Sequence, residues 1–311
     1  MLENRYEYRR RAVPEEPITW ADFISRHQRT RILATDQSGK SEFRAIYLPK
    51  EVISADLKYQ IFEETTRNLR SFLQARSIPA PEDNLIDRLM VINNHDYTVL
   101  SLIGKSDPGL GTLGAGLPNR LCVVNGNAII HKANEEKANF EDLLCIVGTH
   151  EIVHTLAYQE NWVSILKTQD GTFLVDDEKI FRRDGIYANK PRISSIADLN
   201  PQSQQEAQAL GMLAEGMVQY ITEASISSPQ TEILKQLDPY EEITQSIKAM
   251  MSQIEERPFM QATFTRGGFR DLYKAIETRY GKGRFRTLLQ TLSCKSNQPL
   301  PERLRTHGFI A

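Results

Sequence analysis

Two histidines and a glutamate at residues 150 to 154 are the side chains of this chain best suited to metal chemistry. The sequence there is His150-Glu151-Ile152-Val153-His154, which has the form H-E-x-x-H. On a helix, residues four apart lie on one face, so both imidazoles can reach the same metal ion. Glu151 lies beside them, where it can accept a proton from water at the metal. These five residues therefore predict a metal-dependent hydrolase.

The segment that leads into this motif is predicted to be a buried helix. Asn139 is a suitable N-cap, and Glu141 and Asp142 favour the first helical turn. Apolar residues occupy most of the following positions up to Ala157. Because buried polar groups need partners, a metal ion would explain the two histidines and the glutamate. The alternative is a pair of surface histidines beside an unrelated glutamate.

A third protein ligand is expected farther along the chain, since a catalytic zinc site commonly has three and leaves one position for water. The next histidine after the motif is His307, which excludes the metzincin pattern. The better candidate is Glu215, in the apolar middle of a helix predicted to begin at Asn200-Pro201. Gly216 beside it would let another element pack closely. The alternative for Glu215 is a solvated carboxylate on a helix.

At these positions the chain resembles the gluzincin metallopeptidases, which include thermolysin, the leukotriene-hydrolase-type aminopeptidases and the minigluzincins. The matching residues are His150, Glu151, His154 and Glu215. The stretch from Ala214 to Glu223 is similar to the helix that carries the glutamate ligand of the family, although Ala214 stands where an asparagine is common. The resemblance covers roughly residues 85 to 225 and is specific at the four matching positions.

The resemblance implies a zinc metallopeptidase that acts on a peptide or protein substrate. Zn²⁺ would be bound by His150, His154 and Glu215, and Glu151 would deprotonate a zinc-bound water that attacks the scissile carbonyl. The implied fold is α+β, a zincin-like catalytic domain with a mixed sheet and an active-site helix, followed by a mostly helical C-terminal subdomain. Endopeptidase and aminopeptidase activity are not separated by the sequence.

Members of this family also hold the oxyanion with a tyrosine or histidine from a later element. Four residues are candidates for this role: Tyr187, Tyr273, Tyr280 and His307. Tyr273 and Tyr280 are the first to test, although the sequence spacing does not choose among the four. A group that orients a ligating histidine is also expected on the Glu215 helix. Gln219 lies on the same helix face as Glu215. Glu223 lies partway round the helix from that face and is the favoured carboxylate for this role. The alternative interpretation of Glu223 is a charged residue on the protein surface.

Composition and charge are ordinary for a globular protein. The chain has 311 residues, of which 40% are hydrophobic and 25% charged, and its net charge is −2. We therefore expect no general attraction to nucleic acid or to an anionic membrane. No apolar run is long enough for a membrane span, no signal peptide is visible, and three cysteines give no disulfide framework. A cytoplasmic location is the prediction, with export after removal of a leader as the alternative, and the oligomeric state is not predicted.

Four regions are expected along the chain: an N-terminal extension over 1–45, the upper half of the zincin domain with the H-E-x-x-H helix over 46–160, a hairpin insertion and the Glu-ligand helix over 161–230, and a helical C-terminal subdomain over 231–311. The first region is also a candidate inhibitory segment lying in the cleft. Helices are predicted over 54–76, 240–255 and 268–293, the last interrupted at 281–283.

Short apolar runs predict strands at 44–48, 88–92, 121–124 and 128–131. The last would follow a turn at Asn125-Gly126-Asn127, and a hairpin is expected around Asp170-Gly171. The resemblance places either 128–131 or the glycine-rich stretch before Leu121 at the sheet edge that binds extended peptide.

Two other functions were weighed against hydrolysis. The stretch from Gly109 to Gly114 matches G-x-G-x-x-G, but Pro118 soon follows and prevents the long helix that a dinucleotide site requires. A non-catalytic zincin-like domain used for binding or regulation is the main alternative. The presence of Glu151 argues against it, because a binding module does not need the base.

Overall fold

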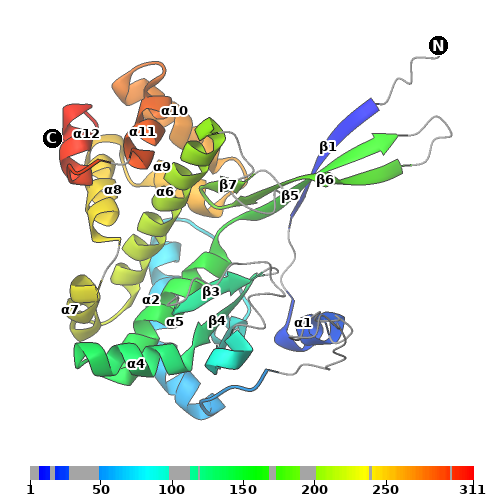
Figure 1. The fold of residues 1–311 in the computed structure, drawn as a ribbon, viewed down its shortest axis with the longest axis vertical. Coiled ribbons are helices and arrows are strands. Elements are labelled where there is room, and N and C mark those ends of the chain that lie inside the picture. Colours follow the sequence, from blue (N-terminus) through cyan, green and yellow to red (C-terminus); the bar gives the residue numbers. More distant parts are fainter. Residues whose placement is uncertain are drawn as a thin grey trace, which may run out of the picture.

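The computed structural model describes residues 7–14, 18–27, 49–97, 113–117, 120–167, 173–189, 201–237, 240–294 and 296–311. In these ranges the chain is mostly helical and has a small mixed three-stranded sheet and an antiparallel four-stranded sheet. This architecture is consistent with the α+β class predicted from the sequence. Figure 1 shows most of the helices gathered into one body, with α1 (Trp20–His27) set apart and the four-stranded sheet extending away from the body.

The three-stranded sheet lies inside the helical body and has the order β2-β4-β3. Strand β2 (Leu89–Ile92) runs parallel to β4 (Leu121–Asn125), and β3 (Gly114–Leu117) pairs antiparallel with β4. Every residue of β4 is buried, because the two faces of the sheet are both covered. Its alternate side chains belong to two different apolar clusters, the main core on one face and a cluster with helix α1 (Trp20–His27) on the other.

Helix α5 (Phe140–Leu156) carries the H-E-x-x-H motif and packs between this sheet and helix α2 (Ala55–Ala75). As predicted, Asn139 caps it by accepting a hydrogen bond from the Asp142 amide. Gly148 brings the two helices together, since a Cβ at that position would lie 2.4 Å from the Phe62 ring. The predicted boundaries of both helices are confirmed to within two residues.

The strand predicted at 128–131 is wrong, because these residues belong to helix α4 (Gly126–Glu136). The Asn125 side chain, interpreted above as part of a turn, instead caps the helix by accepting from the Ala128 amide. Ile129 and Ala133 are buried one turn apart, as on the inner face of a helix. A run of three apolar residues does not distinguish a strand from a helix. Strand β3 therefore forms the sheet edge near the motif helix.

Helix α6 (Pro201–Ser225) follows the predicted course and crosses the body beside α5. Gly216 lets helix α8 (Glu241–Ile254) approach closely, as expected, because a Cβ there would lie 2.7 Å from Ile247. The other helices of the second half are α7 (Ser228–Leu237), α9 (Arg257–Phe264), α10 (Gly268–Tyr280), α11 (Arg284–Ser293) and α12 (Leu300–Thr306). Buried side chains of α8 to α12 join those of α2, α5 and α6 in one apolar cluster.

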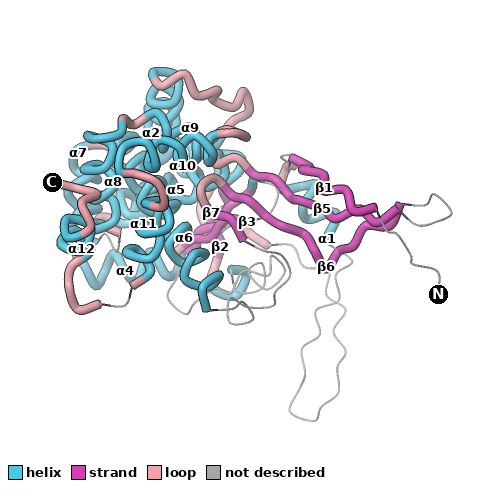
Figure 2. Tube along the Cα trace, turned by 90° about the horizontal axis from the view of Figure 1, so that it is seen from above, coloured by secondary structure: helices cyan, strands magenta, loops and turns pink. Residues whose placement is uncertain are grey.

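The four-stranded sheet has the order β1-β5-β6-β7 and is antiparallel throughout. Its strands are β1 (Glu7–Pro14), β5 (Gln159–Lys167), β6 (Phe173–Asp184) and β7 (Tyr187–Asn189). Strands β5 and β6 flank the predicted hairpin turn at Asp170-Gly171, which itself lies outside the described residues. The two strands project from the body together with β1 (Figure 2). At the base of this sheet, β7 packs against α6.

The described parts of the N-terminal region, residues 7–14 and 18–27, form β1 and α1. Trp20 of α1 donates a hydrogen bond from its indole to the carbonyl of Arg88, the residue before β2. Residues 28–45 of the candidate inhibitory segment lie outside the described residues. The strand predicted at 44–48 lies outside the described residues. Within the described part of the chain, no helix combines the length and apolar character needed to cross a bilayer.

Candidate metal centre

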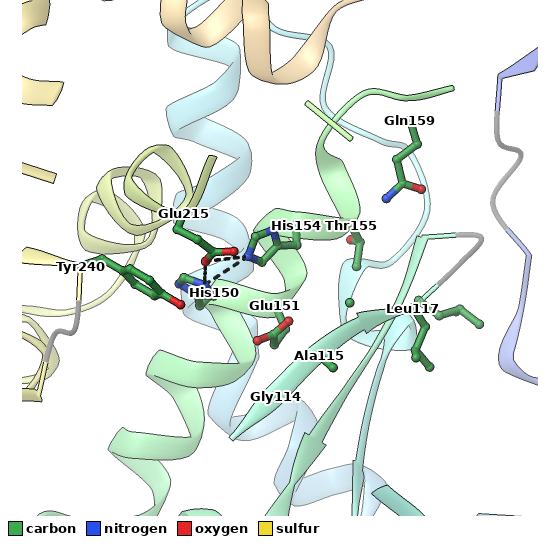
Figure 3. Close-up of a pocket in the computed structure, with 12 residues that line it drawn as sticks. Gly114, Ala115, Leu117, His150, Glu151, His154, Thr155, Gln159, Glu215 and Tyr240 are labelled. Atoms are coloured by element: carbon green, nitrogen blue, oxygen red, sulfur yellow. Dashed lines mark hydrogen bonds and ion pairs between the residues drawn. The ribbon is translucent and has the colours of Figure 1, made fainter. Parts of the chain in front are cut away.

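Three ligand atoms from two helices meet at one point between α5 and α6. The Nε2 atoms of His150 and His154 lie 3.2 Å apart, one helical turn from each other on α5. Glu215 Oε2, from α6, lies 3.2 Å from His150 Nε2 and 3.3 Å from His154 Nε2. Figure 3 shows the three side chains converging on this point. The structure thus brings together the three residues predicted as metal ligands.

The spacing of these atoms is that of ligands around a single small metal ion. Ligand atoms at about 2.0–2.1 Å from a tetrahedrally coordinated ion lie about 3.3–3.4 Å from one another. The three observed separations are within about 0.2 Å of that range. Two imidazole nitrogens and one carboxylate oxygen are also a donor set that divalent metals bind. The group formed by His150, His154 and Glu215 can therefore hold a metal ion.

Gln219 orients the first histidine for this role. Its Oε1 atom lies 3.1 Å from His150 Nδ1 and accepts a hydrogen bond from that nitrogen. A proton on Nδ1 leaves Nε2 with a free lone pair directed at Glu215 and His154. Gln219 is buried and lies one turn after Glu215 on α6, so it was within the pattern considered from the sequence. The favoured residue Glu223 is placed elsewhere, where it forms an ion pair with Lys248 of α8.

Glu151 is held beside the metal-binding atoms in a confined position. Its side chain is only 7% exposed and lies against strand β3. A Cβ added to Gly114 would lie 2.6 Å from Glu151 Cγ, so only glycine leaves room for this carboxylate. Burial raises the pKa of Glu151, an effect that the neighbouring His154 and His150 partly offset. The raised pKa makes this carboxylate a stronger base than an exposed one.

The pKa of Glu215, the second carboxylate of the centre, is shifted in the opposite direction. Burial alone would raise the pKa of Glu215, but His154 and His150 interact with it closely and hold its pKa well below the ordinary value. A carboxylate of low pKa remains ionised and is available as a ligand. The raised pKa of Glu151 therefore suits a base, and the lowered pKa of Glu215 suits a metal ligand.

An open cleft of about 300 Å³ exposes the centre. Strand β3 forms one side of it, and Glu151, the three ligand residues and Tyr240 also line it (Figure 3). Tyr240 precedes α8 and stacks on the His150 ring, with the two ring centroids 5.9 Å apart and the planes at 11°. Tyr240 was not predicted, and Gly114 was noted only as part of the glycine-rich stretch before Leu121. No motif gives either residue its place beside the metal ligands, since each reaches the site only through the packing of its element.

The tyrosines first considered for the oxyanion lie away from the cleft, in the C-terminal helices. Tyr273 is 45% exposed and packs edge-on against Phe285. The Tyr280 hydroxyl donates a hydrogen bond to the Phe309 carbonyl at 2.8 Å. Neither is among the described residues that line the cleft, because α10 is turned toward α9 and α11.

The other two candidates for the oxyanion donor, His307 and Tyr187, lie in different parts of the structure. His307 follows α12 at the C-terminal end of the body, where its carbonyl accepts a hydrogen bond from Arg284. Tyr187 lies closer to the centre, in a second cavity that shares His154 and Glu215 with the cleft. His131 is exposed on α4 beside Glu135 and lies away from the three ligand residues.

Comparison of the chain with models of protein families, with curated proteins and with solved structures found no match. The functional interpretation therefore depends on the geometry of the centre and on the chemistry of its residues.

Proposed function

We propose that this protein is a zinc-dependent peptide hydrolase of gluzincin type. The observation that carries the proposal is the group of three ligand atoms at mutual distances of 3.2 to 3.3 Å with a buried glutamate beside it. A structural zinc site usually has four protein ligands, whereas a catalytic one has three and an open position. Here three described side chains converge on one side of an open cleft, which favours the catalytic kind.

Zinc is the metal that this donor set favours, because two imidazoles and one carboxylate at these separations are typical of hydrolytic zinc sites. When bound there, the ion would polarise a carbonyl group and lower the pKa of a water molecule. Glu215 supplies negative charge to the ion, and the two histidines are neutral donors. Gln219 keeps the proton of His150 on Nδ1, so that Nε2 remains a ligand.

Glu151 is the general base in this proposal. It is next to His150 in sequence, lies within the cleft and has a pKa raised by burial, which brings it closer to the range useful for proton transfer at neutral pH. It would accept the proton of the attacking water and later deliver it to the leaving amine. Gly114 holds the carboxylate in place by allowing β3 to lie directly against it.

Tyr240 is the residue that we propose as hydrogen-bond donor to the developing oxyanion. It lines the same cleft as Glu151, and its ring stacks on His150, which fixes its position relative to the metal ligands. Stacking of an aromatic ring on a ligand also limits the movement of both side chains. Tyr240 thus replaces Tyr273 and Tyr280 in the catalytic assignment.

Strand β3 is the proposed binding strand for an extended substrate. Of the described strands it pairs only with β4, so its second edge faces the cleft. Its sequence, Gly114-Ala115-Gly116-Leu117, has small side chains that let another backbone come close. A peptide added to this edge would be held by main-chain hydrogen bonds across the metal centre.

Metal analysis of the purified protein tests the centre. Wild type is expected to bind one zinc ion per chain, and Glu215→Ala is expected to lose it because a ligand is removed. Glu223→Ala is the matched control, since it removes another carboxylate from α6 that pairs with Lys248 instead. Gln219→Ala should retain the site with an affinity about 10- to 100-fold lower.

Hydrolysis of a mixed peptide library by the zinc-loaded protein tests the activity, with products identified by mass spectrometry. Cleavage that disappears in Glu215→Ala and survives in Glu223→Ala is the expected result. Zinc binding by wild type without cleavage of any peptide would overturn the assignment as a peptidase and favour a binding domain.

A further inference from the structure

A second cavity of about 190 Å³ adjoins the metal ligands. It shares His154 and Glu215 with the cleft, so both cavities meet at the metal centre. Its size exceeds the volume of about 150 Å³ at which an apolar protein cavity binds benzene. A group held at the metal centre therefore has room for one large substituent on this side.

The walls of this cavity come from four elements that are firmly connected. They are the end of α5, the turn between β6 and β7, the middle of α6 and the end of α9. The Tyr158 amide donates to the Thr263 carbonyl at 2.8 Å, and the Gly185 amide donates to the Tyr158 carbonyl at 2.8 Å. These bonds tie the β6–β7 turn to both α5 and α9, so the cavity does not depend on a side chain moving away.

Its lining is mostly apolar. Of the described residues that line it, only His154 and Glu215 can carry charge near neutral pH. The Thr263 hydroxyl already donates to the Phe259 carbonyl within its helix. A charged substituent would lose its hydration here without gaining a counter-ion beyond the centre itself, whereas an apolar one would gain by leaving water.

We infer that this cavity is a specificity pocket for an aromatic or branched aliphatic side chain of the substrate, next to the hydrolysed bond. The base of the four-stranded sheet contributes Gly185, Ile186 and Tyr187 to its wall. Strand β7 lies beside α6 (Figure 1). The inserted sheet thus acquires a role in substrate selection. This inference rests on the proposed function, because the pocket selects only among ligands that reach the metal.

Gly211 of α6 offers a way to fill the pocket without touching a metal ligand. A Cβ at this position would contact the Tyr187 ring at an ordinary 3.7 Å, so alanine fits, but the longer side chain of leucine would extend into the cavity. Gln208→Leu is the matched control, since it adds the same side chain at an exposed position of the same helix. Val218→Ala changes the pocket in the opposite direction and widens it.

The test is binding of a series of hydroxamates to the zinc-loaded protein, measured by calorimetry. Acetohydroxamate reports on the metal alone, 3-phenylpropanohydroxamate and 4-methylpentanohydroxamate add apolar groups, and succinic monohydroxamate adds a charged one. For wild type and Gln208→Leu we expect the phenyl compound to bind about 10- to 100-fold tighter than acetohydroxamate, and the charged compound to show no gain.

Gly211→Leu is expected to lose the gain from the phenyl group while binding acetohydroxamate as wild type does, which also shows that it is folded and loaded. Val218→Ala should shift the preference from phenyl to a larger naphthyl group. A phenyl gain that is absent in wild type, or that survives in Gly211→Leu, would overturn the pocket. Zinc-loaded wild type that binds no hydroxamate at all would instead overturn the proposed catalytic site.

Discussion

The two cavities that meet at the metal centre differ in what surrounds the shared ligands. The cleft is lined by Glu151, Tyr240 and the backbone of β3, which are groups that move protons or donate hydrogen bonds. The pocket is lined by small and apolar side chains of α5, α6 and the β6–β7 turn. In the proposed function, the cleft would carry out the chemistry and the pocket would recognise the substrate, although the two cavities share two of the ligand residues.

Glu151→Gln should have the largest effect on the cleft side. The amide keeps the shape of the side chain but cannot accept the proton, so kcat is expected to fall by about 10²- to 10⁴-fold while zinc content is unchanged. Peptide hydrolysis and metal analysis on the same preparation measure both quantities. Glu141→Gln, at an exposed position of the same helix, is the control. Loss of zinc from Glu151→Gln would show that this residue is structural rather than catalytic.

Tyr240→Phe should come next in size. The ring can still stack on His150, but the hydroxyl is lost, and removal of one oxyanion donor typically lowers kcat by about 10²- to 10³-fold. KM and zinc affinity are expected to change little, which steady-state kinetics and a zinc titration would establish. Tyr273→Phe provides the comparison, since that side chain lies away from the cleft. Equal activity of Tyr240→Phe and wild type would remove Tyr240 from the mechanism.

Gly114→Ala tests whether β3 positions the base. The new methyl group would overlap Glu151 Cγ at 2.6 Å and displace the carboxylate, and such a shift can lower kcat by about 10²-fold. Gly116→Ala, in the same strand, should have a much smaller effect because its Cβ meets His154 Cβ at an ordinary 3.8 Å. If the two variants lost activity equally, the loss would come from strand β3 as a whole and not from crowding of Glu151.

The smallest expected effect is a pH-dependent change in the thermal stability of Glu151→Gln. Because burial raises the pKa of Glu151, the folded state favours the protonated form, and its stability declines as the pH rises above the ordinary glutamate range and through the raised value. Metal-free Glu151→Gln should therefore melt a few degrees above metal-free wild type at pH 8 and at the same temperature at pH 4. Thermal unfolding at the two pH values measures this. A difference that is the same at both would contradict the assigned cause.

Local patterns were sufficient for much of the fold. Helices α5, α6, α8, α10 and α11 were predicted from local signals: the N-cap at Asn139, the helical spacing of apolar residues, and the glycines at 281 and 283. Each of these signals acts within one or two helical turns. Helix α4 was missed for the complementary reason, since Asn125 and a short apolar run are compatible with both a turn with a strand and a capped helix. Packing of Ile129 and Ala133 into the core decided between them.

The candidate site also has parts that the sequence indicated and parts that only the tertiary structure placed. The sequence by itself determined that His150, Glu151 and His154 share one helical region, because spacing of i and i+4 on a helix is a property of the backbone alone. It also indicated Glu215 and Gln219 on a second helix, four residues apart. Only the tertiary structure brought Glu215 Oε2 to 3.2 Å from His150 Nε2 and placed Tyr240, Gly114 and the apolar pocket around them. Contacts across 65 residues of chain are set by how whole elements pack, and no short stretch of sequence encodes that packing.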